Sequence, residues 1–101
     1  MPYRLSAAAE ADLADAWEYV ATESGNDRAD RLLEAVEGGF EMLAAFPSAG
    51  RHRPEFGRHV RSFPVAGYVI YYEPSDILLV ARVLHGRRDQ ETAWTGGERP
   101  E

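Results

Sequence analysis

The residues best suited to chemistry cluster late in the chain, in the run Arg82-Val83-Leu84-His85-Gly86-Arg87-Arg88-Asp89. Arginine stays charged at physiological pH, and its planar fork can bind phosphate or carboxylate through two atoms. A histidine beside arginines could act as the general acid or base in RNA cleavage. His85 is equally consistent with an ordinary loop residue. Arg82 is equally consistent with a salt bridge to a helical acid, because an unpaired buried charge is costly.

Other signatures of catalysis or cofactor binding are missing from the sequence. It has no Walker loop, no Gly-x-Gly-x-x-Gly fingerprint, no His-Glu-x-x-His pair and no nucleophile elbow. The lack of cysteine excludes a disulfide framework and cysteine-based zinc ligation. His52 and His59 lie in a basic segment that would repel a cation, and the histidines lack metal-ligand spacing. We therefore expect no cofactor and no metal.

The charges are unevenly divided along a chain whose formal net charge is −6. Residues 1–46 hold ten acids and three arginines, whereas residues 47–101 hold seven acids and eight arginines. All 11 positively charged residues are arginines. This asymmetry favours a basic face that meets an anionic partner, although an unevenly charged solvated surface would give the same counts.

The length of 101 residues fits one domain that buries a core without disulfides. We expect this domain to span residues 1–90, followed by a flexible polar tail at 91–101. The apolar runs fall far short of the ~20 residues needed to span a bilayer. Residues 1–4 lack the hydrophobic region of a signal peptide. A cytoplasmic protein without membrane association is expected.

Helical periodicity predicts two helices in the first half of the chain. Ser6 is a good N-cap for the first, Gly25 follows its end, and Asn26 or Asp27 is expected to cap the second. The short break between them predicts an antiparallel helical hairpin. Gly38-Gly39 lies inside the second helix, where glycine is unfavourable, and indicates either a kink or a close approach to another backbone.

The second half of the chain has a strand pattern. A short strand is expected at 3–5, before the helices, and a basic loop at 47–59 precedes strands at 60–63, 68–73 and 77–84. Grouped helices followed by grouped strands indicate the α+β class. We expect the short strand and the helical hairpin to pack on a twisted antiparallel sheet, covering one face and leaving the other partly open.

Six segments, in this order, resemble the ParE branch of the RelE/ParE superfamily, which comprises toxins of bacterial type II toxin–antitoxin modules. They are Tyr3-Arg4-Leu5-Ser6 with Ala11-Asp12-Leu13, Trp17-Glu18-Tyr19, Phe46-Pro47-Ser48-Ala49-Gly50-Arg51, Val60-Arg61-Ser62-Phe63, Tyr68-Val69-Ile70-Tyr71-Tyr72, and the late arginine run already quoted. The resemblance extends from Tyr3 to about Asp89. It implies the same fold, a helical hairpin on a twisted antiparallel sheet.

The resemblance implies a toxin that poisons DNA gyrase and blocks replication without being an enzyme. The alternative is a RelE-type, ribosome-dependent mRNA endoribonuclease, whose catalytic residues here would be Arg61, Arg82 and His85. The chain has no lysine, and after the last strand its only aromatic residue is Trp94 rather than a tyrosine, which favours the gyrase reading. A degenerate module that binds antitoxin without toxicity is a third possibility.

The implied partner is a cognate ParD-like antitoxin with a ribbon-helix-helix domain that binds DNA. The toxin would then contact DNA only through this partner, in a hetero-oligomer such as a heterotetramer. An acidic, leucine-containing antitoxin segment would wrap the hairpin grooves and the basic surface of the toxin. The residues expected to bind antitoxin or target are Arg51, Arg53, Arg58, Arg61, Arg82, His85, Arg87 and Arg88.

Overall fold

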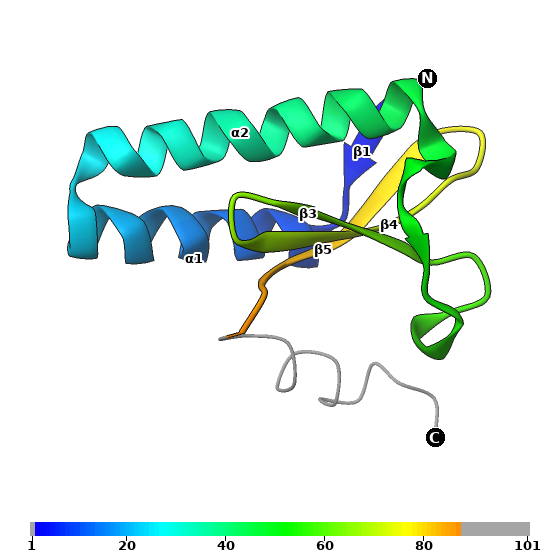
Figure 1. Cartoon of the computed structure of the whole chain (residues 1–101). Helices are drawn as coiled ribbons and strands as arrows, with labels where there is room; N and C mark the ends of the chain where they lie inside the picture. Colours follow the sequence, from blue (N-terminus) through cyan, green and yellow to red (C-terminus); the bar gives the residue numbers. More distant parts are fainter. Residues whose placement is uncertain (1, 88–101) are drawn as a thin grey trace.

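A computed structural model describes residues 2–87, in which two helices pack on a five-stranded sheet (Figure 1). The elements are β1 (Tyr3–Leu5), α1 (Ala7–Ser24), α2 (Asn26–Ala45), the 3₁₀ turn η1 (Pro47–Ala49), β2 (Arg51–His52), the 3₁₀ turn η2 (Pro54–Phe56), β3 (Arg61–Val65), β4 (Tyr68–Glu73) and β5 (Leu78–His85). The predicted α+β class is confirmed. Arg88 and the tail expected at 91–101 lie outside the described residues. No helix within residues 2–87 has the length and apolarity to cross a membrane.

The sheet has the strand order β1-β5-β4-β3-β2 and is mixed. The pairs β2–β3, β3–β4 and β4–β5 are antiparallel, as expected. The first strand instead pairs parallel to β5, with Tyr3 opposite Leu78 and Leu5 opposite Val80. The expected antiparallel sheet is therefore formed by β2 to β5, and the short first strand adds one parallel pair at its edge. Parallel neighbours need a long crossover, and here the helices and three strands separate β1 from β5.

The hairpin is built from two helices that meet at one residue. Ser6 is the predicted N-cap of α1, and its Oγ accepts a hydrogen bond of 3.0 Å from the backbone N–H of Ala9. The cap between the helices is Gly25, not the expected Asn26 or Asp27. Its φ of +97° lies in the region that favours glycine, so the chain can reverse there without strain.

The second helix crosses the sheet closely at Gly39. A Cβ at this position would lie 3.0 Å from Val65 Cγ2 and 3.1 Å from Ile70 Cδ1, closer than most such contacts in proteins. The glycine pair predicted a kink or a close approach to another backbone; at Gly39 the close neighbours are instead the side chains of Val65 and Ile70. Its neighbour Gly38 faces open space, and nothing in the structure explains a glycine there.

Two apolar clusters lie on opposite faces of the sheet. The larger one joins helical residues such as Val36 and Phe40 to the β4 residues Ile70 and Tyr72. The smaller one joins Val60, Tyr71 and Leu84 to the partly buried Phe56 and Val69. The hairpin thus covers one face, as expected. On the other face the segment predicted as a loop at 47–59 contributes Phe56 of η2 to the cover.

Candidate functional site

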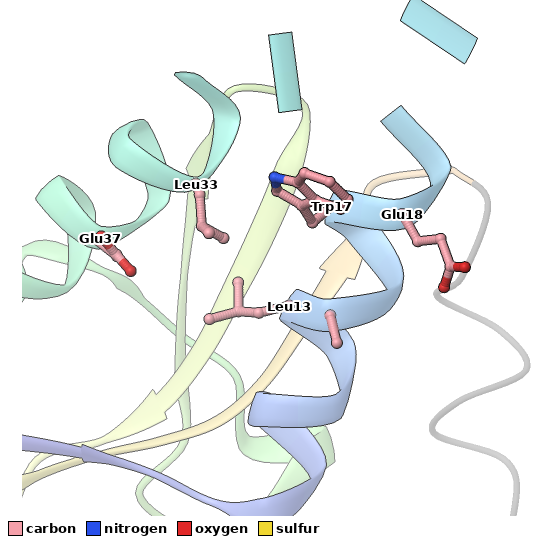
Figure 2. A pocket seen from close by; sticks show the side chains of 6 residues that line it. Leu13, Trp17, Glu18, Leu33 and Glu37 are labelled. Atoms are coloured by element: carbon pink, nitrogen blue, oxygen red, sulfur yellow. The ribbon is translucent and has the colours of Figure 1, made fainter. Parts of the chain in front are cut away.

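A groove of about 520 Å³ lies between the two helices of the hairpin. In Figure 2, Leu13, Trp17 and Leu33 converge in this groove, while Glu18 points away from it. Leu13 and Trp17 are one turn apart on α1, so both side chains reach the same strip of surface. The apolar floor with carboxylates at its rim suits an amphipathic segment with apolar residues and basic neighbours. The lining residues are Leu13, Ala14, Trp17, Glu18, Leu33 and Glu37.

Trp17 is held in place by the opposite helix. Its indole Nε1 donates a hydrogen bond of 2.9 Å to Oδ1 of Asp30 on α2. A buried or half-buried indole normally finds such a partner for its N–H. The ring is therefore positioned before any ligand arrives, which lowers the ordering cost of binding.

Arg53 of the expected basic surface is occupied by contacts within the chain. Its Nε donates to Oε2 of Glu55 at 2.8 Å and its Nη1 to Oγ of Ser62 at 3.1 Å. The guanidinium carbon also lies 5.1 Å from the ring centre of Phe56 and 5.9 Å from that of Tyr71. Arg53 therefore fastens η2 to the open face of the sheet.

Arg61 takes part in a second set of hydrogen bonds, which joins the segment after α2 to the sheet. Its Nη1 donates a hydrogen bond of 2.8 Å to the backbone oxygen of Gly50. The Tyr72 hydroxyl accepts from the Gly50 N–H at 2.9 Å and donates to the Pro47 carbonyl at 2.7 Å. Burial raises the pKa of the Tyr72 hydroxyl, against the opposing influence of Gly50 and Arg61. This network ties the segment after α2 to the sheet.

Arg82 forms the salt bridge that was one of its two sequence-based interpretations. Its guanidinium binds both carboxylate oxygens of Asp12, at 2.8 and 2.9 Å. The side chains retain 18% and 10% of their exposure, so the pair is largely withdrawn from water. Arg82 therefore links α1 to β5 within the chain.

The three residues of the RNA-cleavage hypothesis are not brought together. In the strand register Arg61 lies opposite Tyr72 and His85 lies opposite Tyr68. These two partners are four residues apart on β4, or about 13 Å at the usual strand rise. Arg82 is held by α1. Within residues 2–87 there is also no group of three or more His, Asp or Glu side chains placed to hold a metal.

The remaining predicted binding residues lie at the surface. Arg51, Arg58 and Arg87 are exposed, and in the part of the chain that the structure describes none of them forms an ion pair. His85 is half-buried, with its ring edge-on to Tyr68 at a centroid distance of 5.2 Å. Of the seven predicted residues that lie within residues 2–87, Arg51, Arg58 and Arg87 are the exposed ones.

Comparison with known proteins identifies the family. The model of the family described as "ParE toxin of type II toxin-antitoxin system, parDE" matches residues 3–90. The chain belongs to this ParE toxin family. The resemblance found in the six sequence segments is thereby confirmed.

Two curated relatives extend the family match. Toxin ParE1 of Caulobacter vibrioides is 31% identical over 84 residues, which cover 83% of this chain and 88% of the relative. Toxin ParE1 of Mycobacterium tuberculosis is 30% identical over 89 residues, covering 86% and 91%. A solved structure titled "Chromosomal ParDE TA system from P. aeruginosa" aligns with a TM-score of 0.73 and 17% identity, covering 84% of this chain and 95% of that one. This likeness confirms the fold.

Two arginines of this ParE-family chain were missed by sequence reasoning. Arg28 and Arg31 lie on α2, in the half of the chain dominated by acids, yet they line the same hollow as His85. Their spacing of three residues, which places both on one helical face, was the available signal. Family membership implies an antitoxin partner.

Proposed function

We propose that this ParE-family chain inhibits DNA gyrase in the cytoplasm and is neutralised there by a ParD-like, ribbon-helix-helix antitoxin. The observation that supports this is the dispersal of Arg61, Arg82 and His85, which lie in separate places with separate contacts. A nuclease needs acid, base and phosphate-binding groups around one bond. An inhibitor that acts by binding needs only an accessible surface.

The antitoxin site is proposed to include the hairpin groove. Apolar side chains of an amphipathic helix would fill the space between Leu13, Trp17 and Leu33, and its basic residues would meet Glu18 and Glu37. Acidic antitoxin residues would reach the exposed Arg51 and Arg58. The earlier expectation that Arg53, Arg61 and Arg82 contribute to that contact has less support, since all three are bonded within the chain.

The target is tested by adding the purified chain to gyrase with relaxed plasmid and, in parallel, to translating ribosomes. We expect loss of supercoiling or accumulation of cleaved DNA, no new mRNA cuts, and the same result with His85→Ala. Ribosome-dependent mRNA cuts that disappear in His85→Ala would refute gyrase inhibition and support the endoribonuclease hypothesis. Inactivity in both assays with antitoxin binding intact would identify a degenerate binding module.

The antitoxin site is tested by titrating the cognate antitoxin into Trp17→Ala and Leu33→Ala. Buried aromatic anchors dominate interfaces, so Trp17→Ala should weaken binding by about 2 kcal/mol, roughly thirtyfold. Tyr19→Ala, an aromatic deletion two residues along the same helix, is the matched control and should leave the affinity unchanged. Joint replacement of Arg51 and Arg58 by serine should weaken binding and reduce its salt dependence. Unchanged affinity in all groove variants would refute this site.

A further inference from the structure

A second hollow, of about 440 Å³, lies where the closed end of the hairpin meets the sheet. Tyr19 comes from α1, Arg28 and Arg31 from α2, and Tyr68 and His85 from the sheet. Figure 1 shows the turn between β3 and β4 extending along the hairpin toward that end. The hollow thus gathers cationic and aromatic side chains from three parts of the chain.

The two arginines of this hollow are not neutralised by the acidic helices around them. No carboxylate lines the hollow, and within residues 2–87 neither Arg28 nor Arg31 forms an ion pair. Asp27 and Glu34 lie four residues before and three residues after Arg31, a spacing at which helical ion pairs commonly form. Two like charges three residues apart repel each other. An anion bound between them would relieve that repulsion.

The other walls of the hollow add an aromatic surface. Tyr19 is one of the exposed large side chains, with 46% of its surface accessible. The His85 ring is fixed edge-on to Tyr68, and its Nδ1 accepts a hydrogen bond of 3.2 Å from the Arg87 N–H. The hollow therefore presents a pair of guanidiniums next to exposed ring surface.

We propose that this hollow binds a nucleotide, with its phosphate between Arg28 and Arg31 and its base against the ring of Tyr19. Guanidinium forks match the geometry of phosphate oxygens. Nucleobases stack on exposed aromatic rings. The volume of the hollow falls within the range of small-molecule sites, about 300–1,000 Å³.

The surroundings favour a free mononucleotide over a nucleic-acid strand. Asp27, Asp30 and Glu34 are exposed on the same helix as the two arginines, and the chain as a whole is acidic. One phosphate fits between Arg28 and Arg31, whereas further phosphates of a strand would lie near these carboxylates and be repelled. This hollow shares no lining residue with the groove between the helices, so nucleotide binding here is independent of the proposed antitoxin site and of gyrase inhibition.

The test is isothermal titration of the full chain with adenosine monophosphate, adenosine, inorganic phosphate and a short 5′-phosphorylated DNA strand. We expect the monophosphate to bind about tenfold or more tightly than adenosine and than the DNA strand. Joint Arg28→Gln and Arg31→Gln should lower its affinity about tenfold or more. Tyr19→Leu should weaken binding of the monophosphate and leave the affinity for inorganic phosphate unchanged. Joint Arg51→Gln and Arg58→Gln, another exposed pair, should have no effect.

Each contrary result overturns a defined part of the inference. Equal affinity for adenosine and its monophosphate would refute the phosphate site between Arg28 and Arg31. An equal loss of monophosphate affinity in the Arg51 and Arg58 control would refute it too. Tighter binding of the DNA strand removes the assignment to a free nucleotide. If a glutamate-rich peptide binds and the monophosphate does not, the assignment of a nucleotide as the ligand of this hollow is refuted. Because the replaced side chains are exposed, the variants should keep the wild-type circular dichroism spectrum.

Discussion

The guanidinium of Arg82 on β5 binds both carboxylate oxygens of Asp12 on α1, which lies 70 residues earlier in the sequence. Oδ2 of Asp12 also accepts the backbone N–H of Val83 at 2.9 Å. The pairing of β1 with β5 ends at Leu5 and Val80, so among residues 2–87 no strand pairs with the rest of β5 on that side. Asp12 thus supplies an acceptor that a neighbouring strand would have provided, and α1 shields part of the sheet edge.

Removing the acid of this pair should destabilise the fold strongly. Asp12→Ala removes the carboxylate that the Arg82 guanidinium binds through both oxygens and takes the acceptor from the Val83 N–H. We expect the free energy of unfolding to fall by about 2–4 kcal/mol, measured by urea denaturation. The control is Glu55→Ala, which breaks the pair between Arg53 and a side chain that is 52% exposed. That loss should be much smaller, because exposed ion pairs contribute little to stability, and equal losses would contradict the structural role of Asp12.

The arginines show which part of the site sequence could predict. The pattern placed Arg82 in an otherwise apolar strand and required it to pair with an acid or to face solvent. It could not choose among the helical acids, because that choice depends on how α1 lies along β5. Arg53 and Arg61 were assigned to a basic surface for the same reason. Arg53 pairs with Glu55 and with the uncharged Ser62, and Arg61 donates to the uncharged backbone oxygen of Gly50. The contacts with uncharged groups left no signal in a charge count.

The fold was predictable where a pattern extends over several turns or strand residues. The hairpin, its cap at Ser6 and the apolar strand that became β5 have such patterns. The parallel pairing of β1 had none, because three residues do not reveal the direction of their neighbour. Strand β2 has two residues, Arg51 and His52, too few for an alternation. Tertiary contacts define these elements.

The hydroxyl of Tyr72 should contribute more to stability than a surface hydroxyl. Tyr72→Phe removes the acceptor of the Gly50 N–H and the donor to the Pro47 carbonyl, while keeping the ring in the core. A buried unsatisfied group costs about 1–3 kcal/mol, and we expect a loss of that size in urea unfolding. The control Tyr19→Phe, at an exposed position, should change stability by less than about 0.5 kcal/mol.

Stability should fall in alkaline solution because of the buried tyrosines. Burial raises the pKa of Tyr72 and of Tyr71 above the usual 10.0, with Arg61 and Arg53 acting in the opposite direction. Below the pKa of tyrosine in the unfolded chain, the contribution of these two hydroxyls to the free energy of unfolding is fully present. Above about pH 10 the unfolded state loses its phenolic protons first, so the free energy of unfolding declines. Urea unfolding from about pH 8 to 11 should show this decline, less steeply in Tyr72→Phe; identical slopes would exclude Tyr72 as a source.

The adjacent glycines of α2 should respond differently to alanine. At Gly38 a methyl group meets nothing within 4 Å, so Gly38→Ala should stabilise the protein by about 1 kcal/mol through helix propensity alone. At Gly39 the same methyl group would press on Val65 and Ile70, and the overlap should cancel that gain. Gly39→Leu cannot be accommodated and should unfold the domain at much lower urea concentration. Equal stabilisation by alanine at both positions would show that the helix and sheet can separate more easily than this packing implies.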